Sequence, residues 1–167
     1  MFKASHRYLL LTIIVLTTMI LDQVVKLYIQ HNMRLHETVV VIPGFFHLTY
    51  IRNPGAAFGL LASQGNGFRF IFFGLTSLVA VMLLVMLLYN TPHHQWLAPV
   101  AISLVLGGAF GNLLDRIRFG EVVDFLDFFV NDFHWPAFNV ADSAITVGIT
   151  ILVIHFFMEH KKSPAAS

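Results

Sequence analysis

Four long apolar blocks constrain what this chain can fold into more than any other feature of its sequence. They run over Tyr8–Ile29, Phe68–Tyr89, Trp96–Leu114 and Phe138–Met158. About 20 apolar residues are enough for one helix to cross the hydrocarbon core of a bilayer. Because lipid offers the backbone no water to bond, a spanning segment satisfies its polar groups within a helix. The blocks therefore predict a bundle of four transmembrane helices.

The composition of the chain supports a membrane protein. Hydrophobic residues make up 57% of the 167 residues and charged residues only 11%, whereas a soluble domain carries roughly a quarter charged residues. Cysteine is absent, which excludes disulfides, thiolate metal sites and cysteine nucleophiles. The basic residues are scattered and form no patch of the kind that nucleic-acid binding needs, so we expect no nucleic-acid partner.

The connector between the first two blocks, residues 30–67, contains a signal for β structure. Thr38–Ile42 and Phe46–Ile51 are runs of β-branched and aromatic residues, and the turn dipeptide Pro43-Gly44 separates them. We expect a short hairpin or small sheet here, followed by a glycine- and alanine-rich loop at Asn53–Leu61. The predicted fold class is a membrane all-α bundle of four helices with a small β element between helices one and two.

The connector between the third and fourth blocks, residues 115–137, carries several acids and aromatic residues. We interpret it as a loop, with Asp127 and Asp132 in solvent. The short turn Asn90–Gln95 makes the second and third helices antiparallel neighbours. Both long connectors consequently emerge at one membrane face, opposite the face that holds the short turn.

Polar residues gather at the face where the long connectors emerge. In an up-down bundle this face holds the end of the first helix, the end of the third and the start of the fourth. The polar residues of these helix ends are Asp22, Lys26, Asn112, Asp115, Arg116, Asn139 and Asp142, and the connectors add Asn53 and Asp124. Ionisable residues within membrane spans are costly and usually functional, so their convergence predicts a functional site at this face.

Some of these residues also have a structural interpretation. Asp22 and Lys26 are four apart on one helix face, so they are expected to form an ion pair. Asp115 and Arg116 are interpreted as a second structural pair. Taken alone, Asp142 is most simply a carboxylate at a helix start, where acids are favoured.

Two further patterns concern the packing of the helices. Gly107 and Gly111 are spaced as small residues are where two membrane helices approach closely. Asp142, Thr146 and Thr150 form a polar stripe along the fourth helix, which we expect to face the interior of the bundle.

The residues at the shared face limit the chemistry available there. With no cysteine, no serine beside a plausible base and no histidines at metal-ligand spacing, paired carboxylates are the main candidates for catalysis. When two aspartates approach each other near lipid, one keeps a proton and serves as general acid while the other activates water. The helix-start position favours the charged form of Asp142, and the aromatic surroundings of Asp124 favour its protonated form. The pattern leaves the assignment of the two roles open.

An alternative function is a small proton or ion transporter, because intramembrane carboxylates also form proton relays. A relay predicts acids at successive depths through the bilayer. Here the acids stay at one face, which counts against transport. A non-catalytic membrane scaffold held by polar contacts is the other alternative, and it predicts that Asp124→Asn would be tolerated.

Three motifs stand out along the chain. They are NPGAAFG at Asn53–Gly59, GGAFGNLLDRIRFGEVVDFLDF at Gly107–Phe128 and FNVADS at Phe138–Ser143. Together with Asp22-x-x-x-Lys26 and the four spans, these motifs closely resemble lipoprotein signal peptidase, the bacterial signal peptidase II. The resemblance covers nearly the whole chain, which we treat as a single integral membrane domain, residues 1–167.

The resemblance implies an intramembrane aspartyl endopeptidase. Such an enzyme removes the signal peptide from diacylglyceryl-modified prolipoproteins by cleaving just before the lipidated cysteine. The catalytic pair that it implies is Asp124 and Asp142. Residues implied to line the substrate site or support the pair are Asn53, Asn112, Arg116, Asn139 and Ala141. Those implied to maintain the fold are Asp22, Lys26 and Asp115.

The resemblance also implies a location and partners. The enzyme is expected in the bacterial inner membrane, with cytoplasmic termini, an active site near the periplasmic face and an extracytoplasmic β-cradle formed by the connector strands. We expect no metal or cofactor, because water is the nucleophile and carboxylates handle its protons. The implied partners are prolipoprotein substrates, membrane lipid and peptide inhibitors of the globomycin type, bound by a monomer.

Overall fold

The computed structural model describes residues 4–55, 65–93 and 95–162. Within them, four long helices alternate with short strands in the order α1, β1, β2, α2, α3, β3, β4, α4. Each helix contains a span long and apolar enough to cross a membrane. The helices are α1 (Ala4–Asn32), α2 (Asn66–Asn90), α3 (Leu97–Phe119) and α4 (Val140–Lys162). The four predicted spans are therefore confirmed, and the main difference is that α3 continues to Phe119.

Helix α3 is the central helix, since it packs against each of the other three. Its small residues allow the close approach. A Cβ atom built on Gly107 would lie 2.6 Å from Thr18 Cβ of α1, and one on Gly111 would lie 2.6 Å from Asp22 Oδ2. The predicted packing role of these two glycines is confirmed. It brings the polar end of α1 directly against that of α3.

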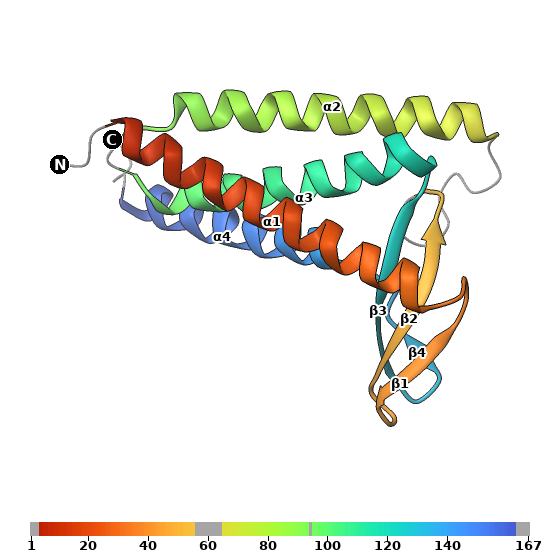
Figure 1. Ribbon diagram of the computed structural model, residues 1–167. Helices are drawn as coiled ribbons and strands as arrows, with labels where there is room; N and C mark the ends of the chain where they lie inside the picture. Colours follow the sequence, from red (N-terminus) through yellow and green to blue (C-terminus); the bar gives the residue numbers. More distant parts are fainter. Residues whose placement is uncertain (1–3, 56–64, 94, 163–167) are drawn as a thin grey trace.

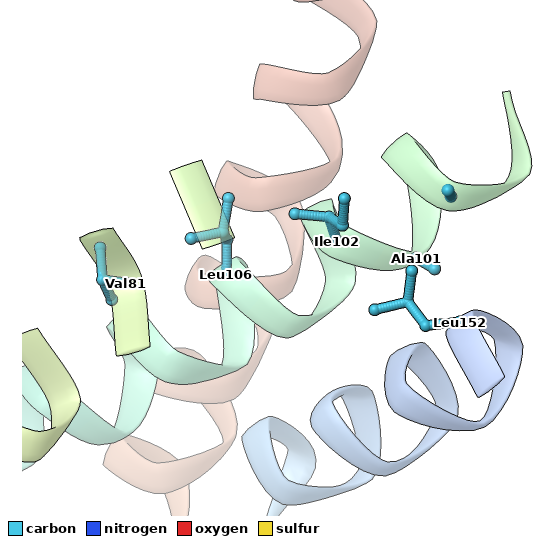
Figure 2. Close-up of a cluster of buried hydrophobic side chains, with 6 residues drawn as sticks. Val81, Ala101, Ile102, Leu106 and Leu152 are labelled. Carbon is cyan, nitrogen blue, oxygen red and sulfur yellow. The ribbon is translucent and has the colours of Figure 1, made fainter. Parts of the chain in front are cut away.

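A cluster of apolar side chains joins the N-terminal half of α3 to its neighbours. Figure 2 shows this cluster, with residues drawn from α2, α3 and α4. Its labelled members are Val81, Ala101, Ile102, Leu106 and Leu152. All five are nearly or completely buried. The cluster fixes the helices laterally, so that the polar ends beyond it are held in a constant arrangement.

The strands form a small sheet at one end of the bundle, where α1 ends and α4 begins (Figure 1). The strands are β1 (Thr38–Ile42), β2 (Phe46–Asn53), β3 (Val122–Val130) and β4 (Phe133–His134). Each pairs antiparallel with the next, in the order β1-β2-β3-β4. The predicted hairpin is confirmed, and its turn contains Gly44 at φ +75°. Of the loop expected at Asn53–Leu61, residues 56–61 lie outside the described residues.

The interpretation of residues 115–137 as a loop is wrong for most of its length. Helix α3 runs on to Phe119, and Gly120 ends it at φ +73°, a left-handed conformation that glycine adopts without strain. The chain then enters β3, where Ile51 of β2 pairs with Asp124. This stretch forms a strand because β2, distant in the sequence, provides a partner for its β-branched and aromatic residues.

The polar stripe predicted on α4 also differs from the structure. Thr146 and Thr150 are exposed and do not face the bundle interior. Each hydroxyl donates to the carbonyl oxygen four residues earlier, at 2.8 Å. Because a threonine can satisfy its hydroxyl on its own helix, it needs no polar partner across the bundle. The buried face of α4 instead carries Ala141, Gly148, Leu152 and His155.

Candidate active site

Helix α4 begins with a reciprocal arrangement of Asn139 and Asp142. Asn139 Oδ1 accepts the backbone N–H of Asp142 at 2.9 Å, and Asp142 Oδ2 accepts that of Asn139 at 3.2 Å. This is the geometry of a capping box. The interpretation of Asp142 as a helix-start carboxylate is thus confirmed, but it accounts for one oxygen only. Oδ1 accepts a hydrogen bond from Asn112 Nδ2 of α3 at 2.8 Å.

Asp124 lies on β3 and is held by two other elements. Its side chain is only 3% exposed. Asn53 Nδ2, from the end of β2, donates to its Oδ2 at 2.9 Å, and Asn139 Nδ2 donates to its Oδ1 at 2.8 Å. Both oxygens therefore face an amide donor, which fixes the orientation of the carboxyl group.

The two aspartates belong to one hydrogen-bonded chain of side chains and line one cavity. Asn139 Nδ2 also lies 3.2 Å from Asn112 Oδ1, so the two amides connect Asp124 to Asp142. A cavity of about 740 Å³ is lined by both carboxyl groups. Both acids therefore border the same cavity.

The structure divides the five residues predicted to support the aspartates. Asn53, Asn112 and Arg116 line the cavity. Asn139 and Ala141 are fully buried and lie behind its wall, where Asn139 acts on the carboxyl groups. All five are brought to the same end of the bundle.

Burial, reinforced by the negative charge of Asp142, raises the pKa of the Asp124 carboxyl from 3.8 to about 7. Hydrogen bonds from Asn53 and Asn139 and the charge of Lys26 lower the pKa and oppose this rise only in part. Near neutral pH Asp124 thus retains a proton on a substantial fraction of molecules. Two neighbouring carboxyl groups in different environments are the arrangement that general acid–base catalysis uses.

We predict that the stability of the protein falls as pH rises from 4 to 7 because of Asp124. An unfolded chain releases this proton near pH 3.8, so between that pH and about pH 7 the folded state binds more protons. The free energy of unfolding falls by on the order of 4 kcal/mol across this range. Melting temperatures of the parent and of Asp124→Asn in detergent measure it. The melting temperature of the variant should rise relative to that of the parent from pH 4 to 7. A difference in melting temperature that stays constant over this range would contradict the assignment.

A buried ion network lies behind the cavity. The Lys26 ammonium is 2.8 Å from Asp22 Oδ2, 2.9 Å from Asp115 Oδ2 and 2.9 Å from Asn112 Oδ1. Lys26 and the two aspartates are each at most 1% exposed. The predicted pair of Asp22 and Lys26 is confirmed. Lys26 also joins α1 to α3, and through Asn112 it reaches the cavity.

The second predicted pair, Asp115 with Arg116, is wrong. Asp115 pairs with Lys26, whereas the Arg116 guanidinium lies 5.3 Å from the ring centroid of Phe73 and lines the cavity. Consecutive residues on a helix do not face each other, which is the reason for the difference. Arg116 Nη1 donates to the carbonyl oxygen of Asn112 at 3.4 Å, so the guanidinium belongs to the cavity wall and not to the ion network.

Each aspartate of the ion network also holds a backbone N–H beside one of the cavity acids. Asp22 Oδ1 accepts the N–H of Ala141 at 2.9 Å, and Asp115 Oδ2 accepts that of Val123 at 3.1 Å. Ala141 immediately precedes Asp142, and Val123 immediately precedes Asp124. The network thus ties both acid-bearing segments to α1 and α3.

Histidines do meet an acid on the outer part of the sheet. Asp127 lies on β3, and its carboxylate is 2.9 Å from His134 Nδ1 and 3.6 Å from His47 Nδ1. The expectation that Asp127 is in a solvated loop is therefore wrong, because pairing of β3 with β2 and β4 places these side chains together. Within the described ranges, no group of three or more His, Asp or Glu side chains could hold a metal ion.

Sequence reasoning missed two polar residues. Gln23 Nε2 contacts both aspartates of the ion network. Arg52 lines the cavity with its guanidinium 4.3 Å from the ring centroid of Phe119, while its Nε donates to the Tyr50 hydroxyl at 2.9 Å. The signal for Gln23 was a polar residue inside an apolar span. That for Arg52 was its position next to Asn53.

Comparison with known proteins agrees with this geometry. The family Peptidase_A8, described as signal peptidase (SPase) II, matches residues 14–158. The chain belongs to the signal peptidase II family. Among its relatives are lipoprotein signal peptidases of Syntrophotalea carbinolica, 50% identical over 90% of this chain and 91% of that one, and of Syntrophus aciditrophicus, 47% identical over 86% and 89%.

Solved structures of bacterial membrane enzymes share the fold. One has a TM-score of 0.83 at 32% identity and covers 94% of this chain and 93% of its own. A second has a TM-score of 0.77 at 37% identity, with 87% and 91% covered. The resemblance drawn from the three sequence motifs is thereby confirmed. As a member of the signal peptidase II family, the protein is a multi-pass membrane peptidase.

Proposed function

We propose that the protein is an intramembrane aspartyl endopeptidase with Asp124 and Asp142 as its catalytic pair. The observation that carries the proposal is that both carboxyl groups line one cavity at the sheet end of the bundle. Each is held by two hydrogen-bond donors, so neither group has to reorganise before it acts.

The environments of the two acids favour different roles. Asp142 accepts hydrogen bonds on both oxygens at the N-terminus of α4, where the helix dipole favours negative charge. It is the general base. Asp124 keeps its proton because burial raises its pKa to about 7, and it is the general acid.

The reaction can be written with these two groups and one water. Asp142 takes a proton from the water while the water oxygen bonds to the scissile carbonyl carbon. In the same step Asp124 gives its proton to the carbonyl oxygen. In the second step the C–N bond breaks, the nitrogen receives the proton from Asp142, and Asp124 recovers a proton from a hydroxyl of the intermediate. The products are a carboxylic acid and an amine, and both aspartates return to their initial states.

The proposed substrates are diacylglyceryl-modified prolipoproteins, cleaved just before the lipidated cysteine. The name of the relatives, lipoprotein signal peptidase, supports this class. The cavity also suits a lipid-bearing substrate. Its lining includes Val147, which is 51% exposed and lies about 10 Å along α4 from its start at Val140. The cavity thus extends from the two acids along the apolar span, where an acyl chain would lie.

We further propose that the enzyme sits in the bacterial inner membrane with its termini in the cytoplasm. The cavity, the sheet and the polar helix ends would then face the periplasm. Support comes from the position of the sheet at one end of the four spans (Figure 1) and from the cavity, which residues of the sheet and of the adjacent helix ends line.

The proposed substrate class and the expectation that cleavage needs no metal ion can be tested together. Purified protein in detergent is given one prolipoprotein with and without its diacylglyceryl group, each with and without EDTA. We expect cleavage before the modified cysteine, at a rate at least about 100-fold above that of the unmodified chain, because lipid binding positions the scissile bond. EDTA should leave the rate unchanged. Equal cleavage of both chains would refute the substrate, and a loss restored by zinc would refute the aspartyl mechanism.

A further inference from the structure

We propose that Gln23, a residue of α1, is a positioning residue that fixes the two catalytic aspartates relative to each other. The inference rests on the proposed function and adds a residue to it. Gln23 lies outside the cavity lining, so it acts on the reaction through other groups. Those groups are the two aspartates of the buried ion network.

Gln23 bridges the two network carboxylates with a single amide nitrogen. Its Nε2 lies 2.9 Å from Asp115 Oδ1 and 3.2 Å from Asp22 Oδ2, and also 3.2 Å from the carbonyl oxygen of Gly111. Every one of these acceptors is an oxygen, so the NH₂ end of the amide must face inward. Its Oε1 faces outward and accepts from Arg118 Nη1 at 3.4 Å, which agrees with that orientation.

The bridge matters because of what the two carboxylates hold on their other sides. Asp22 binds the N–H of Ala141, which precedes Asp142, and Asp115 binds the N–H of Val123, which precedes Asp124. Lys26 joins the same two carboxylates, but it contacts only the Oδ2 atom of each. Within the described residues, Asp115 Oδ1 receives its hydrogen bond from Gln23.

Without the amide, Asp115 keeps the contacts of its Oδ2 with Lys26 and the Val123 N–H but loses the donor on its Oδ1, so its carboxylate is less firmly oriented. A tilt of this carboxylate lengthens its bond to the Val123 N–H, and the segment that carries Asp124 then shifts within its remaining hydrogen bonds to β2 and Asn139. The Asp142 segment keeps its tie through Asp22. The separation of the two catalytic carboxyl groups then varies, and a misplacement of about 1 Å in a catalytic site can cost roughly 100-fold in rate.

The test uses Gln23→Met, which keeps the side-chain length and removes the donor. Gln23 is half-buried. A second variant, Gln23→Asn, keeps a polar amide that is too short to reach both carboxylates. Gln95→Met makes the same change beyond the opposite end of the spans and serves as control. kcat and KM for a lipid-modified prolipoprotein are measured well below the melting temperature of each variant.

We expect kcat to fall roughly 10- to 100-fold in both Gln23 variants, with KM within about twofold of the parent and the control unaffected. An unchanged kcat per folded molecule, with or without a lower melting temperature, would overturn the inference, because it assigns Gln23 a structural role only. A raised KM at constant kcat would overturn it too. If the parent protein itself does not cleave the substrate, the proposed function is wrong. If the parent and the Gln23 variants cleave at the same rate, only the inference about Gln23 is wrong.

Discussion

Lys26→Met should destabilise the protein more than any other single substitution at the polar end of the bundle. The methionine fills a similar volume but removes the charge that holds two carboxylates, at 2.8 and 2.9 Å. Both aspartates are at most 1% exposed, so neither can turn to water. Removing one partner of a buried ion pair costs roughly 3–5 kcal/mol, and here two carboxylates lose their partner together.

The measurement is the melting temperature and the yield of folded protein in detergent. The control is the triple variant Asp22→Asn, Lys26→Met, Asp115→Asn, which removes every charge of the network. Replacing a whole buried charge cluster is far less costly than breaking it, so the triple variant should recover part of the loss. A Lys26→Met protein within about 1 kcal/mol of the parent would show that the network does not hold the fold together.

The sequence predicted those parts of the fold that depend on local composition. Runs of apolar residues set the four spans, and Pro43-Gly44 between two β-branched runs set the hairpin. Because successive helices run in opposite directions, Asp22, Asp142 and the connectors were predicted at one end, as the structure confirms. None of these predictions needed knowledge of which side chain contacts which.

What could not be predicted depends on partners distant in the chain. Strand β3 exists because β2 pairs with it, and Asn53 reaches Asp124 across 71 positions of sequence. The pairing of Asp115 with Lys26 in place of its neighbour Arg116 needs the relative rotation of α1 and α3. Neither the register of a sheet nor the rotation of a helix is encoded in a local pattern.

The candidate site shows the same division. The types of these residues and the motifs predicted that they gather at one end of the bundle, as the structure shows, but not which side chain contacts which. Asn139 proved to serve two acids at once, by its side chain toward Asp124 and by its backbone toward Asp142. Ala141 contributes its N–H to Asp22, a role that no side-chain pattern can indicate.

Asp124→Asn and Asp142→Asn should each abolish cleavage almost completely, by about 1,000-fold or more. General acid–base catalysis contributes roughly 100- to 10,000-fold, and one asparagine removes either the acid or the base. An asparagine has nearly the same shape as aspartate but only one acceptor oxygen, so in each variant one of the two donors that face the carboxylate loses its acceptor. The double variant should lose little more than either single one, because the two groups act as a unit.

Asp127→Asn provides the matched control for these variants. It makes the same substitution on the same strand as Asp124, three positions further along, and its carboxylate contacts His47 and His134 instead of the cavity. It should retain nearly the full rate. Circular dichroism and melting temperatures in detergent confirm that each variant is folded before its rate is compared.

The rate at which folded Asp124→Asn and Asp142→Asn cleave a diacylglyceryl-modified prolipoprotein is the most direct test of the catalytic pair. The account predicts that each variant falls to about a thousandth of the parental rate or less while Asp127→Asn stays close to the parent. If either folded variant instead cleaved at a rate near that of the parent, the two acids lining the cavity would not be the groups that hydrolyse the bond.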